Sequence, residues 1–378
     1  MLGPLAPIAI FLAIELLDEL VFGVREAAWP AIRRDLHLDY ASIGILLAVP
    51  GVVSGVFEPF IGLLGNSAKR RFIIFAGGIT FALALLLAAG AGSAAVLLLA
   101  FGLLYPASGA FVSLSQASLM DLDPASHERN MARWVLAGSI GVVIGPLAFV
   151  LATRMGWGWR ALFVVLALTT LPLAVHSRRP PQIIDLPTET FRSSARTAWR
   201  AIRNLRVIRW LVLLELTDLL GDILTGFLAL YFVDVVHVSL TDAALAVVLW
   251  SVAGLVGDAL LVPLLERASG VAYLRISALL AAVVYPALLL TPGLAPKLIL
   301  LCVLGVLRAG WYAIPQGRLY SELHGNSGVA LAVSNVAGLP AQTFPLILGV
   351  LAQGFGLEAA LWCCLLAPIA LLVGLPRS

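Results

Sequence analysis

Acidic residues recur at helical spacing within two strongly apolar stretches of the chain. The first group is Glu15, Asp18 and Glu19, and the second is Glu215, Asp218 and Asp222. Residues three, four or seven positions apart lie on one face of a helix, so each group forms a single stripe. Carboxylates close together in an apolar site cannot all stay ionised, so one of them can take up and release a proton. Such a stripe also attracts cations, and Asp18 and Asp218 are the best candidates for proton coupling.

The energetic cost of these charges also points to a function. Nine acidic residues and two arginines lie within apolar stretches, and each costs about 2.5–3.5 kcal/mol when it faces lipid. Their sum, on the order of 30 kcal/mol, exceeds a typical folding stability of about 5–15 kcal/mol. The groups must therefore line a wet cavity, pair with one another or carry protons. Arg308, the main internal cation, is expected either to hold a carboxylate ionised or to anchor an anionic group of a substrate.

The composition of the 378-residue chain identifies its environment. Hydrophobic residues make up 61% and charged residues 12%, against roughly 45–50% and about 25% in soluble proteins. Such a chain cannot cover itself with polar surface in water. This excludes a soluble enzyme, a nucleic-acid-binding module and a disordered protein. We expect a multi-pass protein of the plasma (inner) membrane.

Charges and turn residues divide the chain into apolar stretches of membrane-spanning length, which is about 20 residues. Twelve spans are predicted, near residues 8–30, 41–65, 72–91, 94–119, 132–153, 160–177, 210–233, 242–265, 272–291, 297–320, 328–352 and 356–375. With both termini in the cytoplasm, seventeen Lys and Arg residues lie inside and five, including Lys297, lie outside. This bias follows the positive-inside rule and predicts an N-in, C-in topology.

The two halves of the chain repeat one another. The acidic stripe that contains Asp18 matches the one that contains Asp218 at an offset of 200, and Glu58 matches Asp258 at the same offset. We therefore predict two six-helix bundles, residues 1–177 and 210–378, related by an axis along the membrane normal. Residues 178–209 between them are predicted to form a basic amphipathic linker helix. That helix either lies on anionic membrane lipid or is a solvated linker that only enforces topology.

Three motifs resemble those of the major facilitator superfamily. Residues 62–71, after the second span, are similar to its inter-helix motif, although Asn66 stands where the family usually has Asp. Residues 141–146, which contain two glycines followed by Pro146, resemble the glycine–proline motif of drug:proton antiporters. Residues 157–163 are similar to a frequent corner between spans five and six. The resemblance implies twelve helices, a central cavity lined by helices 1, 4, 7 and 10, and alternating access.

Within the superfamily, residues 40–50 and Glu58-Pro59 resemble the fosmidomycin-resistance-like exporters. The family also commonly has gating or inter-domain charge networks, and the residues expected to form them here are Glu58, Asp258, Arg70 and Arg71. Helices 4 and 10 would supply a cavity wall made of Tyr105, Ser108, Gln116, Trp311, Tyr312 and Gln316. Aromatic side chains in such a wall can stack on a flat or cationic substrate, although simple packing is the commoner role.

These observations predict a proton-driven exporter of cationic or amphipathic small molecules. The alternative is a carrier coupled to H⁺ or Na⁺ that moves a zwitterionic lipid, lysolipid or metabolite and uses Arg308 as the anion anchor. No HExxH, GxSxG or Walker pattern is present, so we expect no enzyme activity, metal centre or cofactor beyond the coupling ion. We also expect a monomer that binds no nucleic acid.

Overall fold

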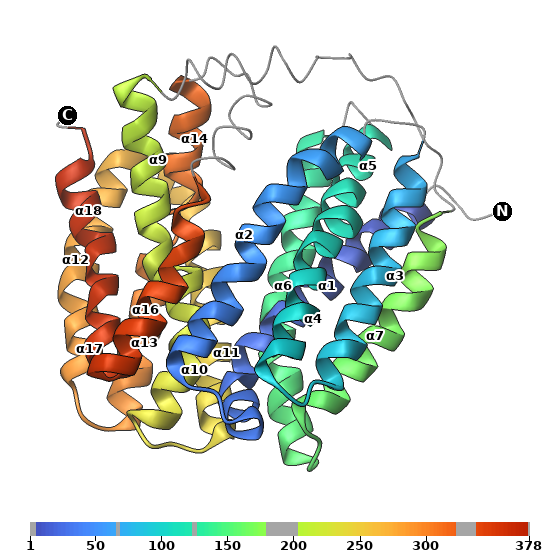
Figure 1. Cartoon of the computed structure of the whole chain (residues 1–378). Coiled ribbons are helices and arrows are strands. Elements are labelled where there is room, and N and C mark those ends of the chain that lie inside the picture. Colours follow the sequence, from blue (N-terminus) through green and yellow to red (C-terminus); the bar gives the residue numbers. More distant parts are fainter. Residues whose placement is uncertain (1–4, 66–68, 123–126, 179–202, 323–337, 377–378) are drawn as a thin grey trace. The chain divides into compact units, whose positions relative to one another are not determined.

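The computed structural model describes residues 5–65, 69–122, 127–178, 203–322 and 338–376. Every regular element within these ranges is a helix, which confirms the all-α prediction. The chain divides into two compact units, Met1–Pro187 and Thr188–Ser378, which are described separately below (Figure 1). The predicted linker helix falls largely on residues 179–202, which lie outside the described ranges.

Unit 1 is built from long helices with short connections. Its elements are α1 (Leu5–Leu36), α2 (Tyr40–Gly65), α3 (Arg70–Ala89), α4 (Ala94–Ser108), the π-helical η1 (Gly109–Ser113), α5 (Leu114–Leu122), α6 (His127–Arg154) and α7 (Trp159–His176). Helix α1 packs along α6, and α3 lies beside both α4 and α7 (Figure 1). Because α4, η1 and α5 follow one another directly, they form one span that contains a π-helical turn.

Unit 2 contains more interrupted helices. Its elements are α9 (Leu205–Thr217), η3 (Asp218–Leu220), α10 (Asp222–Asp234), α11 (Leu240–Leu265), α12 (Gly270–Leu290), α13 (Leu294–Leu307), α14 (Ala313–Glu322), η4 (Ala341–Thr343), α16 (Phe344–Phe355), α17 (Leu357–Leu361), η5 (Trp362–Leu365) and α18 (Leu366–Gly374). The predicted span 210–233 is therefore broken at Gly221, and span 297–320 is broken between α13 and α14.

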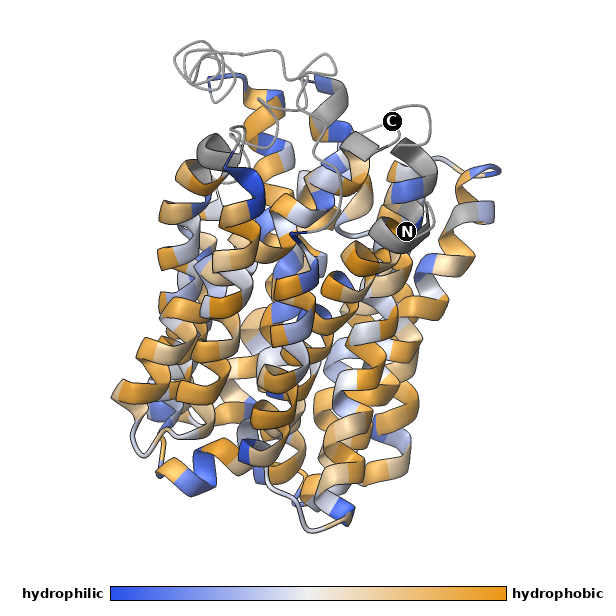
Figure 2. Ribbon diagram, turned by 90° about the vertical axis from the view of Figure 1, so that its right-hand side faces the viewer, coloured by the Kyte–Doolittle hydropathy of each residue, from blue (hydrophilic) through white to orange (hydrophobic). Residues whose placement is uncertain are grey.

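Eight helices in the described ranges are long and apolar enough to cross a membrane, and two shorter helices are also apolar. Figure 2 shows hydrophobic residues over much of the helical surface. Helix α1 is longer than any of the eight, but it carries three carboxylates within five residues. A multi-pass membrane protein is thus indicated, while the twelve-span count and the orientation remain predictions.

Side-chain caps define where several helices begin. The backbone N–H of Ser42 donates a 2.7 Å hydrogen bond to Oδ1 of Asp39, just before α2. Hydrogen bonds from Ser42 hold the pKa of the Asp39 carboxyl below its ordinary value. Ser93, Ser239 and Ser269 cap α4, α11 and α12 with their hydroxyl groups. These helices therefore begin at polar capping residues, close to the places where the sequence predicts a loop before a span.

The glycine–proline motif of residues 141–146 forms the contact between α6 and α1. A Cβ atom on Gly141 would lie 2.5 Å from the backbone oxygen of Leu16, and one on Gly145 would lie 2.6 Å from that of Leu20. Any larger residue would push the two helices apart. In this structure the motif therefore holds α6 directly against the helix that carries the first acidic stripe.

Lys297, which the topology prediction counts on the outer side of the membrane at the start of span 297–320, lies near the start of α13 and is buried in unit 2. The residue is 6% exposed, and its ammonium group donates to the backbone oxygens of Leu288 (2.7 Å) and Leu289 (3.0 Å) and to the hydroxyl of Tyr231 (2.5 Å). These backbone oxygens belong to the last turn of α12, whose carbonyl groups have no partner within the helix. Lys297 thus caps α12 from within unit 2.

Candidate transport site in the two helical units

Asp18 joins α1 to α4. Its side chain is buried, with 7% of the residue exposed, and its Oδ1 accepts a 2.9 Å hydrogen bond from the hydroxyl of Ser108. Ser108 is the last residue of α4, directly before the π-helical turn η1. A hydrogen bond to the ionised form of a carboxylate stabilises that form, so Ser108 favours ionised Asp18.

Glu15 and Glu19 lie against α6. A Cβ atom on Gly138 would stand 2.6 Å from Oε1 of Glu15 and 3.4 Å from Cγ of Glu19. The absence of a side chain at Gly138 therefore leaves the space that the Glu15 carboxyl group occupies. The stripe predicted on the first helix is divided between two neighbours, because Asp18 faces α4 while Glu15 and Glu19 contact α6.

Arg25, two turns beyond Asp18 on α1, is buried and belongs to a separate cluster. Its guanidinium forms an ion pair with Glu26 and a hydrogen bond with the hydroxyl of Tyr105. The guanidinium carbon also lies 4.7 Å from the ring centroid of Phe22. Tyr105, predicted to be part of a cavity wall, is thus held by Arg25, and this cation already has a carboxylate partner.

The gating residues predicted in unit 1 occupy two places. Glu58 on α2 accepts a 3.2 Å hydrogen bond from Ser54, and its Cγ would lie 3.5 Å from a Cβ atom on Gly109. Arg70 is 4% exposed at the start of α3, and next to it the Nε of Arg71 is buried without a hydrogen-bond partner.

The second acidic stripe lies at the break between α9 and α10. The backbone N–H of Asp222 donates a 3.2 Å hydrogen bond to Oδ1 of Asp218, across Gly221. Directly before Asp218, the hydroxyl oxygen of Thr217 lies 2.7 Å from the backbone oxygen of Leu214 and 3.1 Å from that of Trp311. Glu215 is half-buried, and its Oε1 would lie 3.2 Å from a Cβ atom on Gly338. The stripe is therefore not one continuous helical face, because the chain unwinds through it.

Arg308 is the cation beside this second stripe. Its guanidinium carbon lies 4.5 Å from the ring centroid of Trp250, on α11. Its electrostatic neighbours are Asp222, Asp258 and Asp218. Among the described residues, none of these carboxylates comes within ion-pair distance of the guanidinium, and its buried Nε has no hydrogen-bond partner. Arg308 thus lies among carboxylates without being bound to one of them.

The other residues predicted for a cavity wall have mixed surroundings. Gln116 lies 3.7 Å from the sulfur of Met131, and Trp311 is buried with its indole N–H donating to Ser277 over 3.0 Å. Trp311 is therefore a packing residue of unit 2, because a buried indole N–H needs an acceptor. Tyr312 is 69% exposed, and Oε1 of Gln316 is buried without a hydrogen-bond partner.

Sequence reasoning missed the π-helical turn and the contact between Gly138 and Glu15. The sequence signals were Pro106, followed within three residues by Gly109, and a glycine one turn before the glycine–proline motif. Neither signal gives the distance between helices. Within the described ranges, no group of three or more His, Cys, Asp and Glu side chains could hold a metal ion.

The sequence pattern of the Major Facilitator Superfamily matches residues 16–344. Among solved structures, the chain is similar to a bacterial homologue of the human lysosomal transporter Spinster, in its inward-facing and occupied conformation. That similarity has a TM-score of 0.73 at 17% sequence identity and covers 97% of this chain and 92% of the other. The nucleoside transporter NupG is also similar, with a TM-score of 0.77 at 14% identity over 98% of this chain and 97% of that one. At these identities the likeness concerns the fold, and no curated protein sequence matches the chain.

Proposed function

This chain belongs to the Major Facilitator Superfamily and is a secondary transporter rather than an enzyme, and we propose that it exports cationic or amphipathic small molecules in exchange for protons. The proposal places the chain in the plasma (inner) membrane as a twelve-span monomer with both termini in the cytoplasm. The coupling ion is H⁺, and no other cofactor takes part.

The observation that carries this proposal is the surplus of carboxylates over cations at the two stripes. Between residues 15 and 26 of α1 the carboxylates are Glu15, Asp18, Glu19 and Glu26, and one arginine, Arg25, lies among them. In unit 2 the carboxylates around the broken helix are Glu215, Asp218, Asp222 and Asp258, again with one arginine, Arg308. Four carboxylates with one cation favour both proton uptake and the binding of a positively charged ligand.

Exchange follows if protons and substrate compete for the same carboxylates. A cationic substrate bound beside Asp18 or Asp218 favours the ionised carboxylate and releases its proton. Proton uptake from the other side of the membrane removes the negative charge and releases the substrate. The two events are thereby linked without any covalent step, and the proton gradient drives export.

The test is flux of the lipophilic cation tetraphenylphosphonium in proteoliposomes of the purified full-length chain under an imposed pH gradient. We expect the gradient to drive flux in the wild type and Asp18→Asn or Asp218→Asn to abolish it, because an amide cannot carry the proton. Glu266→Gln is the matched control, since it removes the same charge from an exposed residue that directly follows α11 and belongs to neither stripe. Flux that is independent of the gradient, or equal in all variants, would refute the exchanger.

One observation favours a second candidate, a carrier coupled to H⁺ or Na⁺ for a zwitterionic lipid, lysolipid or metabolite. Arg308 has no ion-pair partner among the described residues, and it lies on the face of Trp250. A guanidinium in this state can bind a phosphate or carboxylate group of a substrate. If lysophosphatidylcholine stabilises the wild type and not Arg308→Gln, while no cation flux occurs, this second function replaces the first.

A further inference from the structure

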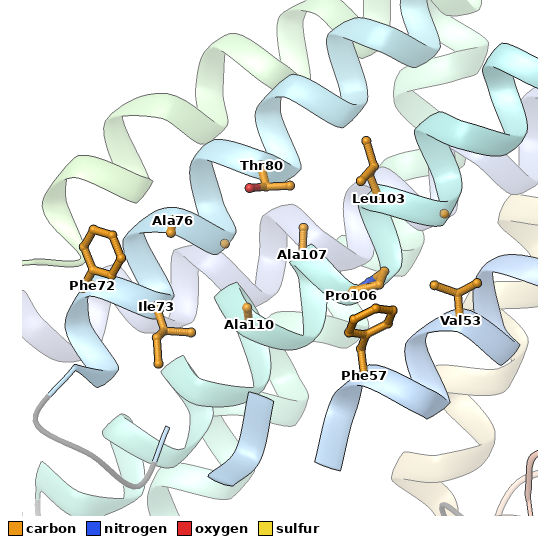
Figure 3. Close-up of a pocket in the computed structure, with 12 residues that line it drawn as sticks. Val53, Phe57, Phe72, Ile73, Ala76, Thr80, Leu103, Pro106, Ala107 and Ala110 are labelled. Atoms are coloured by element: carbon orange, nitrogen blue, oxygen red, sulfur yellow. The ribbon is translucent and has the colours of Figure 1, made fainter. Parts of the chain in front are cut away.

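An apolar groove of about 360 Å³ opens on unit 1 between α2, α3 and α4 (Figure 3). Its lining consists of Val53, Phe57, Phe72, Ile73, Ala76, Gly77, Thr80, Gly102, Leu103, Pro106, Ala107 and Ala110. Thr80 supplies the one polar side chain of this lining. The groove contains neither stripe of carboxylates, so it is separate from the candidate transport site.

The groove lies on an exposed face of the unit. Phe57, Phe72 and Leu103 are 50%, 61% and 43% exposed, and Figure 3 shows their side chains around the opening between the three helices. In a membrane-spanning helix an exposed apolar face is covered by lipid. A hollow in such a face has the shape and polarity to take up a hydrocarbon chain.

A positive charge lies at one end of the groove. Lys69 directly precedes α3 and is exposed, and it stands three, four and seven positions before Phe72, Ile73 and Ala76. Residues at this spacing share one face of a helix, so Lys69 continues the face that lines the groove. From Phe72 to Thr80 that face is about 12 Å long. Lys69 is also at the end of the helix that the positive-inside rule assigns to the cytoplasm.

We propose that this groove is a binding site for one anionic phospholipid of the inner leaflet, with an acyl chain between α2, α3 and α4 and the phosphate on Lys69. Basic residues at the cytoplasmic ends of membrane helices attract anionic headgroups, and the apolar lining takes the chain. Charge at one end and a wall that is apolar except for Thr80 match the two parts of a phospholipid better than those of a small polar solute.

The groove floor is also the segment that contacts the buried carboxylates. Pro106, Ala107 and Ala110 line the groove, while the two residues between them contact carboxylates: Ser108 donates to Asp18 on α1, and Gly109 lies against Glu58 on α2. An acyl chain pressed against this π-helical turn would therefore stabilise the arrangement that positions Ser108. The bound lipid thus favours one arrangement of the transport site.

Binding is tested with the detergent-purified full-length chain, by measuring its thermal unfolding midpoint with phosphatidylglycerol or with phosphatidylcholine of the same acyl chains. We expect phosphatidylglycerol to raise the midpoint more. Lys69→Gln should abolish the difference between the two lipids, whereas Lys69→Arg should keep it. Arg154→Gln, which removes an exposed charge at the opposite end of the unit, is the control.

The acyl part of the site is tested by filling the groove. Thr80→Trp should abolish the stabilisation by either lipid, and Leu168→Trp, at a site on α7 that is 57% exposed, should leave it unchanged. A phosphatidylglycerol with a photoreactive acyl chain should label residues 72–80 and 102–110 of the wild-type protein. This test does not depend on whether a variant folds. Labelling confined to other segments, equal stabilisation by both lipids, or competition by tetraphenylphosphonium for the labelled groove would overturn the proposal.

The effect on transport rests on the proposed function and is measured separately. We expect cation flux to be faster in liposomes that contain phosphatidylglycerol than in pure phosphatidylcholine, and Thr80→Trp to remove this difference. If lipid labels the groove but no flux occurs under any gradient, the binding site stands and the exchanger fails. If flux occurs and is insensitive to lipid and to Thr80→Trp, the regulatory effect is refuted.

Discussion

The hydroxyl of Ser108 donates a 2.9 Å hydrogen bond to Oδ1 of Asp18, and this bond joins the end of α4 to the middle of α1. The two residues are ninety positions apart in the chain. Ser108 precedes a π-helical turn, a feature that often occurs at functional sites. Asp18, the least exposed carboxylate of the first stripe, therefore accepts its hydrogen bond from the end of α4 that adjoins the π-helical turn.

Removal of the Ser108 hydroxyl should change how transport depends on pH. Because the hydroxyl stabilises the ionised form of Asp18, Ser108→Ala should let the proton remain bound up to a higher pH. A bond to an ionised group contributes about 1.5–3 kcal/mol, so the midpoint of flux against pH should rise by about one unit or more. Ser108→Thr, which keeps a hydroxyl, should restore the wild-type profile. If the midpoint of flux against pH is unchanged in Ser108→Ala, Asp18 is not the residue that couples proton transfer to transport.

A side chain at Gly138 should impair the first stripe. In Gly138→Ala the new Cβ atom would lie 2.6 Å from Oε1 of Glu15, so the carboxyl group or α6 must move. Overpacking of this kind costs about 1–3 kcal/mol. We expect a lower unfolding midpoint and reduced proton-driven flux per folded molecule. Gly158→Ala, which has open space around its Cβ position, should match the wild type in both measurements.

Replacement of Arg308 should also shift the pH dependence, and the sign follows from its charge. The cation favours the ionised forms of Asp218 and Asp258, so its loss should let them hold protons up to a higher pH. The midpoint of flux against pH should therefore rise in Arg308→Gln and stay near the wild-type value in Arg308→Lys. A midpoint that falls in Arg308→Gln would contradict this arrangement of charges.

The surroundings of Arg308 can also be tested by changing Trp250. The ring centroid of Trp250 lies 4.5 Å from the guanidinium carbon of Arg308, and its indole N–H donates a 2.8 Å hydrogen bond to the hydroxyl of Thr225. Trp250→Phe keeps a ring but loses the hydrogen bond, which contributes about 0.5–1.5 kcal/mol. We expect a modest fall in the unfolding midpoint. Flux should fall only if the position of Arg308 matters for transport. Thr225→Val gives the comparison, because it keeps the indole ring while it removes this bond and the 2.8 Å bond from the Thr225 hydroxyl to the backbone oxygen of Gly221.

Lys297 should be a stability residue rather than a transport residue. Lys297→Met leaves the hydroxyl of Tyr231 and the last carbonyl groups of α12 without their donor, at about 1–3 kcal/mol for each unsatisfied group. The unfolding midpoint should fall clearly, whereas Tyr231→Phe, which removes one of the three acceptors, should lower it less. Flux per folded molecule should not change. Equal stability of Lys297→Met and the wild type would refute the capping role.

Several features could be predicted because they depend on residues near one another in the chain. Apolar stretches of membrane length and the polar residues between them predicted the helices and most of their ends. The glycine–proline motif at 141–146, together with the two other motifs, resembled the superfamily whose sequence pattern matches this chain. The local pair of Arg25 and Glu26 is likewise a property of adjacent positions.

Features that depend on distances across the fold could not be predicted. The spacing of Glu15, Asp18 and Glu19 indicates one face, but the positions of α4 and α6 decide that Asp18 meets Ser108 while Glu15 meets Gly138. The charge of Lys297 assigns it to the outer side of the membrane, but its burial could not be predicted, because the carbonyl groups at the end of α12 and the hydroxyl of Tyr231 that compensate for it come from other helices.

The sequence by itself determined a helical membrane transporter with more carboxylates than cations inside its apolar stretches, because composition, periodicity and charge sign are carried by the residues alone. Only the tertiary structure decided which carboxylate has a donor, which cation lacks a partner among the described residues, and where the exposed apolar surface of unit 1 is hollow. These features depend on helix separations of a few ångströms. The separations are set by the close packing of glycines, prolines and aromatic rings from distant parts of the chain.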